Sequence, residues 1–229
     1  MMQLAYVNID KIINLDGITK HVLVIKNPHE FYKIVNLLNE QSSCAVDDGF
    51  VLSDSATQLE LKMHSHCDIL IDYFNMQFND KKIQNLINSR AVEIVNNSEL
   101  KIEYDKSAQA FNDLIDKIIS QLEIRTTSEA EISIMDILKI GNLKVLEWYK
   151  NPLEMIVNYI NILTELKNID ILFLVNVKQI LNEKEVIELY EHCSYIKLNL
   201  VLIETEASSP KIANEEIIYI DNDLCEVDY

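Results

Sequence analysis

Glycine is scarce in this sequence, and its scarcity excludes the commonest way of holding a nucleotide. The 229 residues include only three glycines, Gly17, Gly49 and Gly141. A phosphate-binding loop needs several glycines, followed by lysine and serine or threonine, because its backbone N–H groups must close around the phosphate. The best-placed turn, residues 26–30, contains a proline and a glutamate but no glycine. We therefore do not expect nucleotide hydrolysis by a phosphate loop.

Basic residues are also few. Lysine and arginine total 20 against 37 aspartates and glutamates, so the formal net charge is -17. Nucleic acid and anionic membranes repel such a chain as a whole. The deficit is uneven, since residues 1–80 carry 5 basic and 11 acidic groups, residues 81–150 carry 10 and 11, and residues 151–229 carry 5 and 15. Residues 81–150 are where an anionic partner would be sought first.

Cysteine pairs and long apolar runs are absent. The four cysteines, Cys44, Cys67, Cys193 and Cys225, form no Cys-x-x-Cys pair. No apolar stretch approaches the ~20 residues that span a bilayer, and the start of the chain does not have the pattern of a signal peptide. We therefore expect a cytoplasmic protein that contacts no membrane, with reduced thiols that serve as small core residues.

The sequence has enough apolar residues, 48%, to build a sizeable core. Apolar runs of strand length recur at 21–25, 69–71, 171–175, 198–203 and 215–220, with a possible hairpin at 51–61. Helical patterns follow these runs, and Asn27, Asn151 and Asn182 are placed to cap them. Strands that alternate with crossover helices indicate an α/β fold with a mainly parallel sheet.

Residues 79–150 have a different pattern, with helical periodicity and no convincing strand. Apolar residues mark one amphipathic helix over 83–95 and a second over 111–122, which follows the i, i+3, i+4, i+7 spacing. A third helix is predicted to begin between Ser128 and Glu131 and to end at Gly141. The predicted organisation is an α/β head, residues 1–78 and 151–229, interrupted by a helical extension, residues 79–150.

No arrangement of residues indicates catalysis. There is no Gly-x-Ser-x-Gly motif, and the adjacency of His192 and Cys193 does not by itself make a catalytic dyad. In an extended segment, His64 and His66 would point to one face and could hold zinc, but no second cluster supplies the remaining ligands. The edge of a strand leading into residues 69–71 is the favoured interpretation of these histidines. We expect a protein that acts by binding and assembly.

Several segments resemble a known family when they are taken in order. Phe173-Leu174-Val175-Asn176 is followed, four residues later, by Leu181-Asn182-Glu183-Lys184-Glu185-Val186, and 200–204 and 219–223 continue the pattern. Earlier parts of the pattern are residues 15–35, 69–87 and 131–139. This set covers nearly the whole chain and resembles the Csn-two family, the spacer-acquisition accessory proteins of type II-A CRISPR–Cas systems.

The resemblance implies an assembly and a cation. Members of that family form a homotetrameric ring around a positively charged pore, which threads onto the ends of double-stranded DNA without sequence preference and without hydrolysing nucleotide. Their core resembles a degenerate nucleotide-hydrolase fold, and bound Ca²⁺ holds the ring in its DNA-competent shape. The Ca²⁺ ligands expected here are acidic residues of the extension: Glu123, Glu129, Glu131 and Asp136. Their spacing matches no EF-hand loop, so on the residues alone they read as a solvated helix start.

The expected DNA contacts lie in the charge-balanced segment. They are Lys81, Lys82, Lys106, Lys117 and Arg125, and the alternative for each is a solvated surface side chain. CRISPR acquisition integrases and the effector nuclease are the implied protein partners. Two rival functions remain open, namely a protein–protein scaffold of the acquisition complex without direct DNA contact, which the net charge favours, and a degenerate nucleotide hydrolase.

Overall fold

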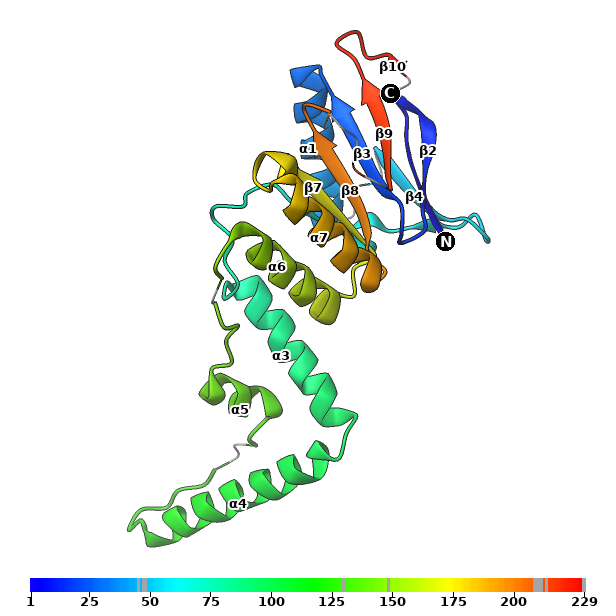
Figure 1. Ribbon diagram of the computed structural model, residues 1–229. Coiled ribbons are helices and arrows are strands. Elements are labelled where there is room, and N and C mark those ends of the chain that lie inside the picture. Colours follow the sequence, from blue (N-terminus) through cyan, green and yellow to red (C-terminus); the bar gives the residue numbers. More distant parts are fainter. Residues whose placement is uncertain are drawn as a thin grey trace. The chain divides into compact units, whose positions relative to one another are not determined.

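The chain divides into two compact units. We call Met1–Met76 with Tyr149–Tyr229 the head, and Gln77–Trp148 the extension. The computed structural model describes residues 1–44, 46, 49–128, 131–147, 149–207, 212 and 214–227 (Figure 1). The two junctions fall close to the boundaries predicted at residues 78/79 and 150/151.

A six-stranded sheet forms the centre of the head. Its order is β10 (Glu226–Val227), β9 (Glu215–Ile220), β3 (Lys20–Ile25), β8 (Asn199–Glu204), β7 (Ile171–Val175) and β6 (Cys67–Leu70). All neighbouring pairs from β9 to β6 are parallel, and only β10 runs antiparallel to its neighbour. Both faces of these parallel strands are covered, which explains their continuous apolar runs. The predicted α/β class with a mainly parallel sheet is confirmed for this layer.

A second sheet, which is antiparallel, was not predicted as a sheet. Its order is β2 (Ile9–Leu15), β1 (Met2–Tyr6), β4 (Phe50–Asp54) and β5 (Glu60–Leu61). The hairpin expected over residues 51–61 is present as the β4–β5 pair, with Leu52 opposite Leu61. The first two strands were missed because each buries only alternate or scattered side chains, so they lack a continuous apolar run.

The core of the head lies in two layers, one on each face of the parallel sheet. Alternate residues of a strand point to opposite faces, so that Val24 and Leu202 belong to one layer while Leu23 and Ile203 belong to the other. Helices α6 (Pro152–Lys167) and α7 (Glu183–Tyr195) pack on the first face. Helix α1 (Pro28–Ser43) and the antiparallel sheet cover the second (Figure 1).

The helix starts of the head follow the predicted capping. The Asn27 side chain accepts hydrogen bonds from the backbone N–H groups of His29 and Glu30. Asn151 accepts one from the N–H of Glu154, and Asn182 forms a reciprocal capping box with Glu185. Because these side chains satisfy N–H groups that have no partner within the helix, each helix begins at the predicted position.

The described residues of the extension form three helices. They are α3 (Lys81–Asn96), α4 (Leu100–Gln121) and α5 (Ile134–Gly141), and α3 contacts both of the others. The Asn79 side chain bonds to the N–H and the C=O of Val145, which ties the beginning of the extension to its end. The described residues of the extension contain no strand, as predicted. None of the helices in the described ranges has the length and apolarity to cross a membrane.

Two predicted helix starts in the extension were wrong. Helix α4 begins at Leu100, well before residue 111. The prediction placed the start too late because polar residues interrupt the apolar spacing in the first half of the helix. Helix α5 begins at Ile134 and not between Ser128 and Glu131. The reason is local, since Ser133 and Asp136 form a capping box that fixes the helix start between them.

Candidate nucleic-acid interface

An apolar stripe runs along α4 and is open to solvent. None of the 22 residues of this helix is buried. The stripe repeats at helical spacing, so its side chains share one side of the helix. With their exposed fractions, they are Leu100 at 50%, Phe111 at 37%, Leu114 at 54%, Ile118 at 48% and Leu122 at 47%. Exposed apolar side chains gathered on one side of a helix favour a site of contact with another molecule.

The extension has almost no core of its own. Among its described residues only Phe78 and Ile83 are buried hydrophobics. Helices in water gain most of their stability by packing an apolar face against another element. Residues 131–133 cover one side of α4, where the Tyr104 hydroxyl donates to the Ile132 carbonyl at 2.7 Å. The stripe lies beside this covered side and stays uncovered.

The five predicted DNA contacts all lie on the extension and all are exposed. Lys81 and Lys82 begin α3, Lys106 and Lys117 lie on α4, and Arg125 follows α4. Lys106 and Lys117 are about three turns apart, so they point to the same side of α4 and away from the apolar stripe. Lys106 also meets Glu103 at 3.1 Å, an exposed pair of small energetic value that a phosphate can replace.

The predicted Ca²⁺ ligands are spread from the connection between α4 and α5 into the first turn of α5, where Asp136 lies. Glu123 and Glu131 are exposed, and Glu129 lies outside the described residues. Asp136 accepts hydrogen bonds from the backbone N–H and the hydroxyl of Ser133, which lower the pKa of its carboxyl. Within the described ranges, no three His, Cys, Asp or Glu side chains lie close enough to hold a metal ion.

The turn that follows β3 is occupied by its own side chains. Asn27 takes up two N–H groups at the start of α1, and the buried carboxylate of Glu30 accepts hydrogen bonds from Tyr6 and Asn8. A phosphate placed here would meet a carboxylate and would find two of the N–H donors already engaged. These contacts are those of a capped helix start, as the sequence of this turn predicts.

Residues 45–224 match the model of a protein family described as CRISPR-associated protein (Cas_Csn2). The chain belongs to this family. Family membership gives it a role in CRISPR systems and confirms the resemblance found in the sequence. No curated protein matches the chain.

Solved structures show distant similarity to ATP-binding cassettes. A bacterial Atm1-family ABC exporter with ATP bound shares 13% identity at a TM-score of 0.44, over 96% of this chain and 37% of the exporter chain. A nucleotide-free ATP-binding cassette from an ABC transporter shares 13% identity at 0.41, over 90% and 82% of the two chains. A putative ABC transporter ATP-binding protein from Pyrococcus furiosus shares 11% at 0.39, over 94% and 96%. These scores are too low to bear on the function of this Cas_Csn2 family member.

A buried polar network in the head was missed by sequence reasoning. Lys178 donates from its backbone N–H to Glu204 at 3.1 Å and from Nζ to Oε1 of Glu215 at 2.6 Å, and the Tyr190 hydroxyl donates to the same Oε1 at 2.6 Å. Burial raises the pKa of Glu204 to about 7. The signal in the sequence was a glutamate at the end of the apolar run 200–204, where a charged residue is unusual.

The His64–Cys67 segment does not gather its side chains. His64 and His66 lie on the short helix α2 (Met63–His66) and not on an extended strand edge, so the predicted alternation was wrong. His66 meets Asp170 at 2.6 Å, and Cys67 is buried in the core, where burial raises the pKa of its thiol. His64 instead lines a cavity of about 360 Å³. The cluster therefore offers no joint metal site.

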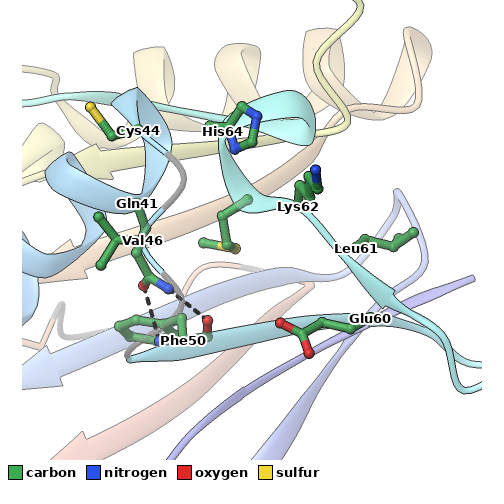
Figure 2. A pocket seen from close by; sticks show the side chains of 9 residues that line it. Gln41, Cys44, Val46, Phe50, Glu60, Leu61, Lys62 and His64 are labelled. Carbon is green, nitrogen blue, oxygen red and sulfur yellow. Dashed lines mark hydrogen bonds between the residues drawn. The ribbon is translucent and has the colours of Figure 1, made fainter.

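That cavity lies between the end of α1 and the β4–β5 pair. Figure 2 shows the Gln41 side chain beside it, bonded to both backbone groups of Phe50. The amide of Gln41 donates to the Phe50 carbonyl at 2.8 Å and accepts from the Phe50 N–H at 3.0 Å. These two bonds hold the first residue of β4 against the helix, so the cavity wall has a structural role.

Proposed function

We propose that the chain is a non-enzymatic DNA-binding protein that assembles into a homotetrameric ring on the ends of double-stranded DNA during CRISPR spacer acquisition. The uncovered apolar stripe of α4 is the observation that carries this proposal. Membership of the Cas_Csn2 family places the chain in a CRISPR system. The tetramer number, the preference for ends and the acquisition partners come from the family resemblance.

Self-association gives the extension the apolar packing that it lacks within one chain. A second copy offers an identical apolar stripe, and isologous pairing of two such stripes buries both. Pairing along α4 also brings two extensions together without using the side of the helix that carries Lys106 and Lys117. That side remains available to a ligand. The same helix can therefore serve assembly on one side and DNA binding on another.

DNA binding by so acidic a chain depends on concentrating its positive charge. Affinity without sequence preference comes from lysine and arginine contacts to phosphate and from release of counterions. A ring multiplies each contact by the number of copies, so that individually weak sites add to useful avidity. The head carries most of the negative charge and therefore repels DNA that approaches it directly.

Calcium is proposed to stabilise the assembly through acidic residues between α4 and α5. Glu123 and Glu131 present exposed carboxylates there, and carboxylate oxygens are the ligands that Ca²⁺ prefers. In a single chain the described carboxylates do not converge. A site completed by residues of two copies would couple cation binding to assembly.

The solution mass tests the proposal, measured by light scattering with Ca²⁺ and with a chelator. A tetramer in Ca²⁺ that becomes smaller on chelation, and that retains duplex DNA with an affinity that falls steeply with salt, is the expected result. A monomer in both conditions contradicts the ring. An oligomer that binds no duplex at low salt contradicts DNA binding and favours the scaffold function.

A further inference from the structure

An open groove of about 560 Å³ lies in the head between α7 and the connection from β2 to β3. Its lining includes Ile18, Ile187, Tyr190, Glu191, Tyr195 and Ile212. The rim stands in solvent, since Ile18 is 63% exposed and Tyr195 is 85% exposed. Small-molecule sites bury most of their ligand, whereas large apolar side chains around an open hollow favour contact with a segment of another protein.

The rim residue Ile18 is held in place by the chain around it. Asp16 accepts hydrogen bonds from the backbone N–H groups of Ile18 at 2.8 Å and Thr19 at 2.7 Å. The N–H of Gly17 donates to the side chain of Asn199 at 2.7 Å. Because the backbone of this connection is already ordered, little conformational entropy is lost when a partner covers Ile18.

Helix α7 supplies the other side of the groove. Ile187, Glu191 and Tyr195 are spaced four residues apart, so they share one side of the helix. The opposite side packs into the core through Val186, Leu189, Tyr190 and Cys193. Ile187 and Tyr195 take no part in that core and remain exposed. The fold of the head does not use them, so they are available to a partner.

The accessible charge of the groove is negative. Glu191 is exposed and forms no ion pair with the described residues. Lys20 also lines the groove, but it is 1% exposed, so a partner cannot reach its ammonium. The charged side chains that α7 exposes are Glu183, Lys184, Glu188 and Glu191. Charge complementarity therefore favours a basic partner and disfavours a second copy of this acidic chain.

We propose that this groove docks an amphipathic, basic segment of another protein. An apolar side chain of that segment lies between Ile18 and Tyr195, and a lysine or arginine beside it pairs with Glu191. The apolar contact supplies most of the affinity, because an exposed ion pair contributes little. The pair at the rim instead selects which segments bind. The groove belongs to the head, so this docking does not depend on the stripe of α4.

The test is a selection of short random peptides, displayed on phage, with the full chain as bait. Binders are then screened against Ile18→Glu, and those that the variant loses are synthesised and titrated by calorimetry. We expect these peptides to combine at least one large apolar residue with lysine or arginine. Ile18→Glu is expected to weaken them by at least about tenfold, since it places a carboxylate at the centre of the apolar contact.

Charge reversal in the groove tests the ion pair. Glu191→Lys is expected to weaken the selected peptides by about fivefold or more, because an attraction becomes a repulsion. Glu183→Lys is the matched control. It changes the net charge by the same amount on the same helix, about two turns from Glu191, and is expected to leave the affinity within about twofold of the wild type.

Three outcomes overturn the proposal. The first is a selection that yields acidic peptides, or none that Ile18→Glu loses. The second is an equal loss of affinity in Glu191→Lys and Glu183→Lys, since net charge alone would then attract the peptides. The third is a smaller solution mass for Ile18→Glu than for the wild type, which would make a second copy the occupant of the groove. Both rim positions tested are exposed, so the variants are expected to fold, and circular dichroism checks this.

Discussion

Lys178 and Glu215 form an ion pair of 2.6 Å that is almost completely withdrawn from water. The pair joins the turn after β7 to the beginning of β9, and Glu204 at the end of β8 accepts the backbone N–H of the same lysine. The Lys178 ammonium pairs with Glu215, and it is also near enough to Glu204 to favour the charged form of that carboxyl. One lysine cannot fully neutralise the carboxylates of both Glu204 and Glu215. The protonation state of Glu204 therefore affects the free energy of unfolding of the head.

The first prediction concerns pH. The pKa of Glu204 is raised from 4.5 to about 7 by burial. Between these two values the folded chain binds more protons than the unfolded chain, so this group makes stability fall as pH rises through the window. Glu204→Gln keeps the acceptor and removes the charge. From pH 5 to pH 8 the free energy of unfolding of the wild type is expected to fall. In Glu204→Gln we expect this fall to be smaller, by up to about 3 kcal/mol.

Urea unfolding at the two pH values measures this effect. Lys178, Glu215, Tyr190 and Tyr73 are the other titratable groups that interact with Glu204, and the comparison of wild type with variant removes their shared contribution. The exposed neighbour Glu206 supplies the control, Glu206→Gln, which should leave the pH dependence unchanged. An identical pH dependence for wild type and Glu204→Gln would show that this glutamate is ionised at neutral pH.

The second prediction concerns the stripe of α4. Ile118→Glu places a charge on the apolar side of the helix and is expected to lower the assembly mass, because burying an unpaired carboxylate in an interface is unfavourable. Ile102→Glu is the matched control, since this isoleucine is 57% exposed and lies on the opposite side of the same helix. Light scattering compares the two. Retention of the wild-type mass by Ile118→Glu would exclude the stripe as the contact.

The third prediction concerns the basic side of α4. The double variant Lys106→Glu with Lys117→Glu is expected to weaken the binding of linear duplex uniformly across sequences. The slope of the logarithm of the binding constant against the logarithm of the salt concentration is expected to become shallower by at least about one per lost phosphate contact. The control reverses two exposed lysines of the head, Lys33→Glu with Lys184→Glu. Affinities at several salt concentrations provide the measurement. Equal losses in the two double variants would mean that net charge alone governs binding.

The fourth prediction concerns calcium. Glu123→Gln with Glu131→Gln is expected to weaken Ca²⁺ binding by about tenfold or more, since two charged oxygen ligands are replaced by neutral ones. Glu99→Gln removes an exposed carboxylate at the other end of α4 and serves as the control. Calorimetric titration with Ca²⁺ distinguishes them. If both variants bind as the wild type does, the cation site lies elsewhere.

Local patterns made much of the fold predictable. The strand at 171–175 was predicted with its observed bounds, because both faces are buried and every residue is apolar. The helix starts at Asn27, Asn151 and Asn182 followed from side chains within three residues of the groups they cap. The family followed from the order of such segments along the chain.

Features that depend on distant residues were not predictable. Strands β1 and β2 are stabilised by pairing with each other and with β4, so their own sequence carries little signal. The partner of Lys178 lies 37 residues away, and the burial of Lys20 depends on α7 packing over the start of its strand. In the proposed ring, the acidic ligands and the basic contacts of the extension would be completed by other copies of the chain, which no pattern within one copy reveals.

The measurement that tests the central claim most directly is a mobility shift with three forms of one duplex, namely linear, closed circular, and linear with both ends blocked by a bulky protein cap. In Ca²⁺ the ring account predicts retention of the open linear form alone, and loss of that retention on chelation. Equal binding of the three forms, or of none, would contradict a ring that enters DNA through its ends.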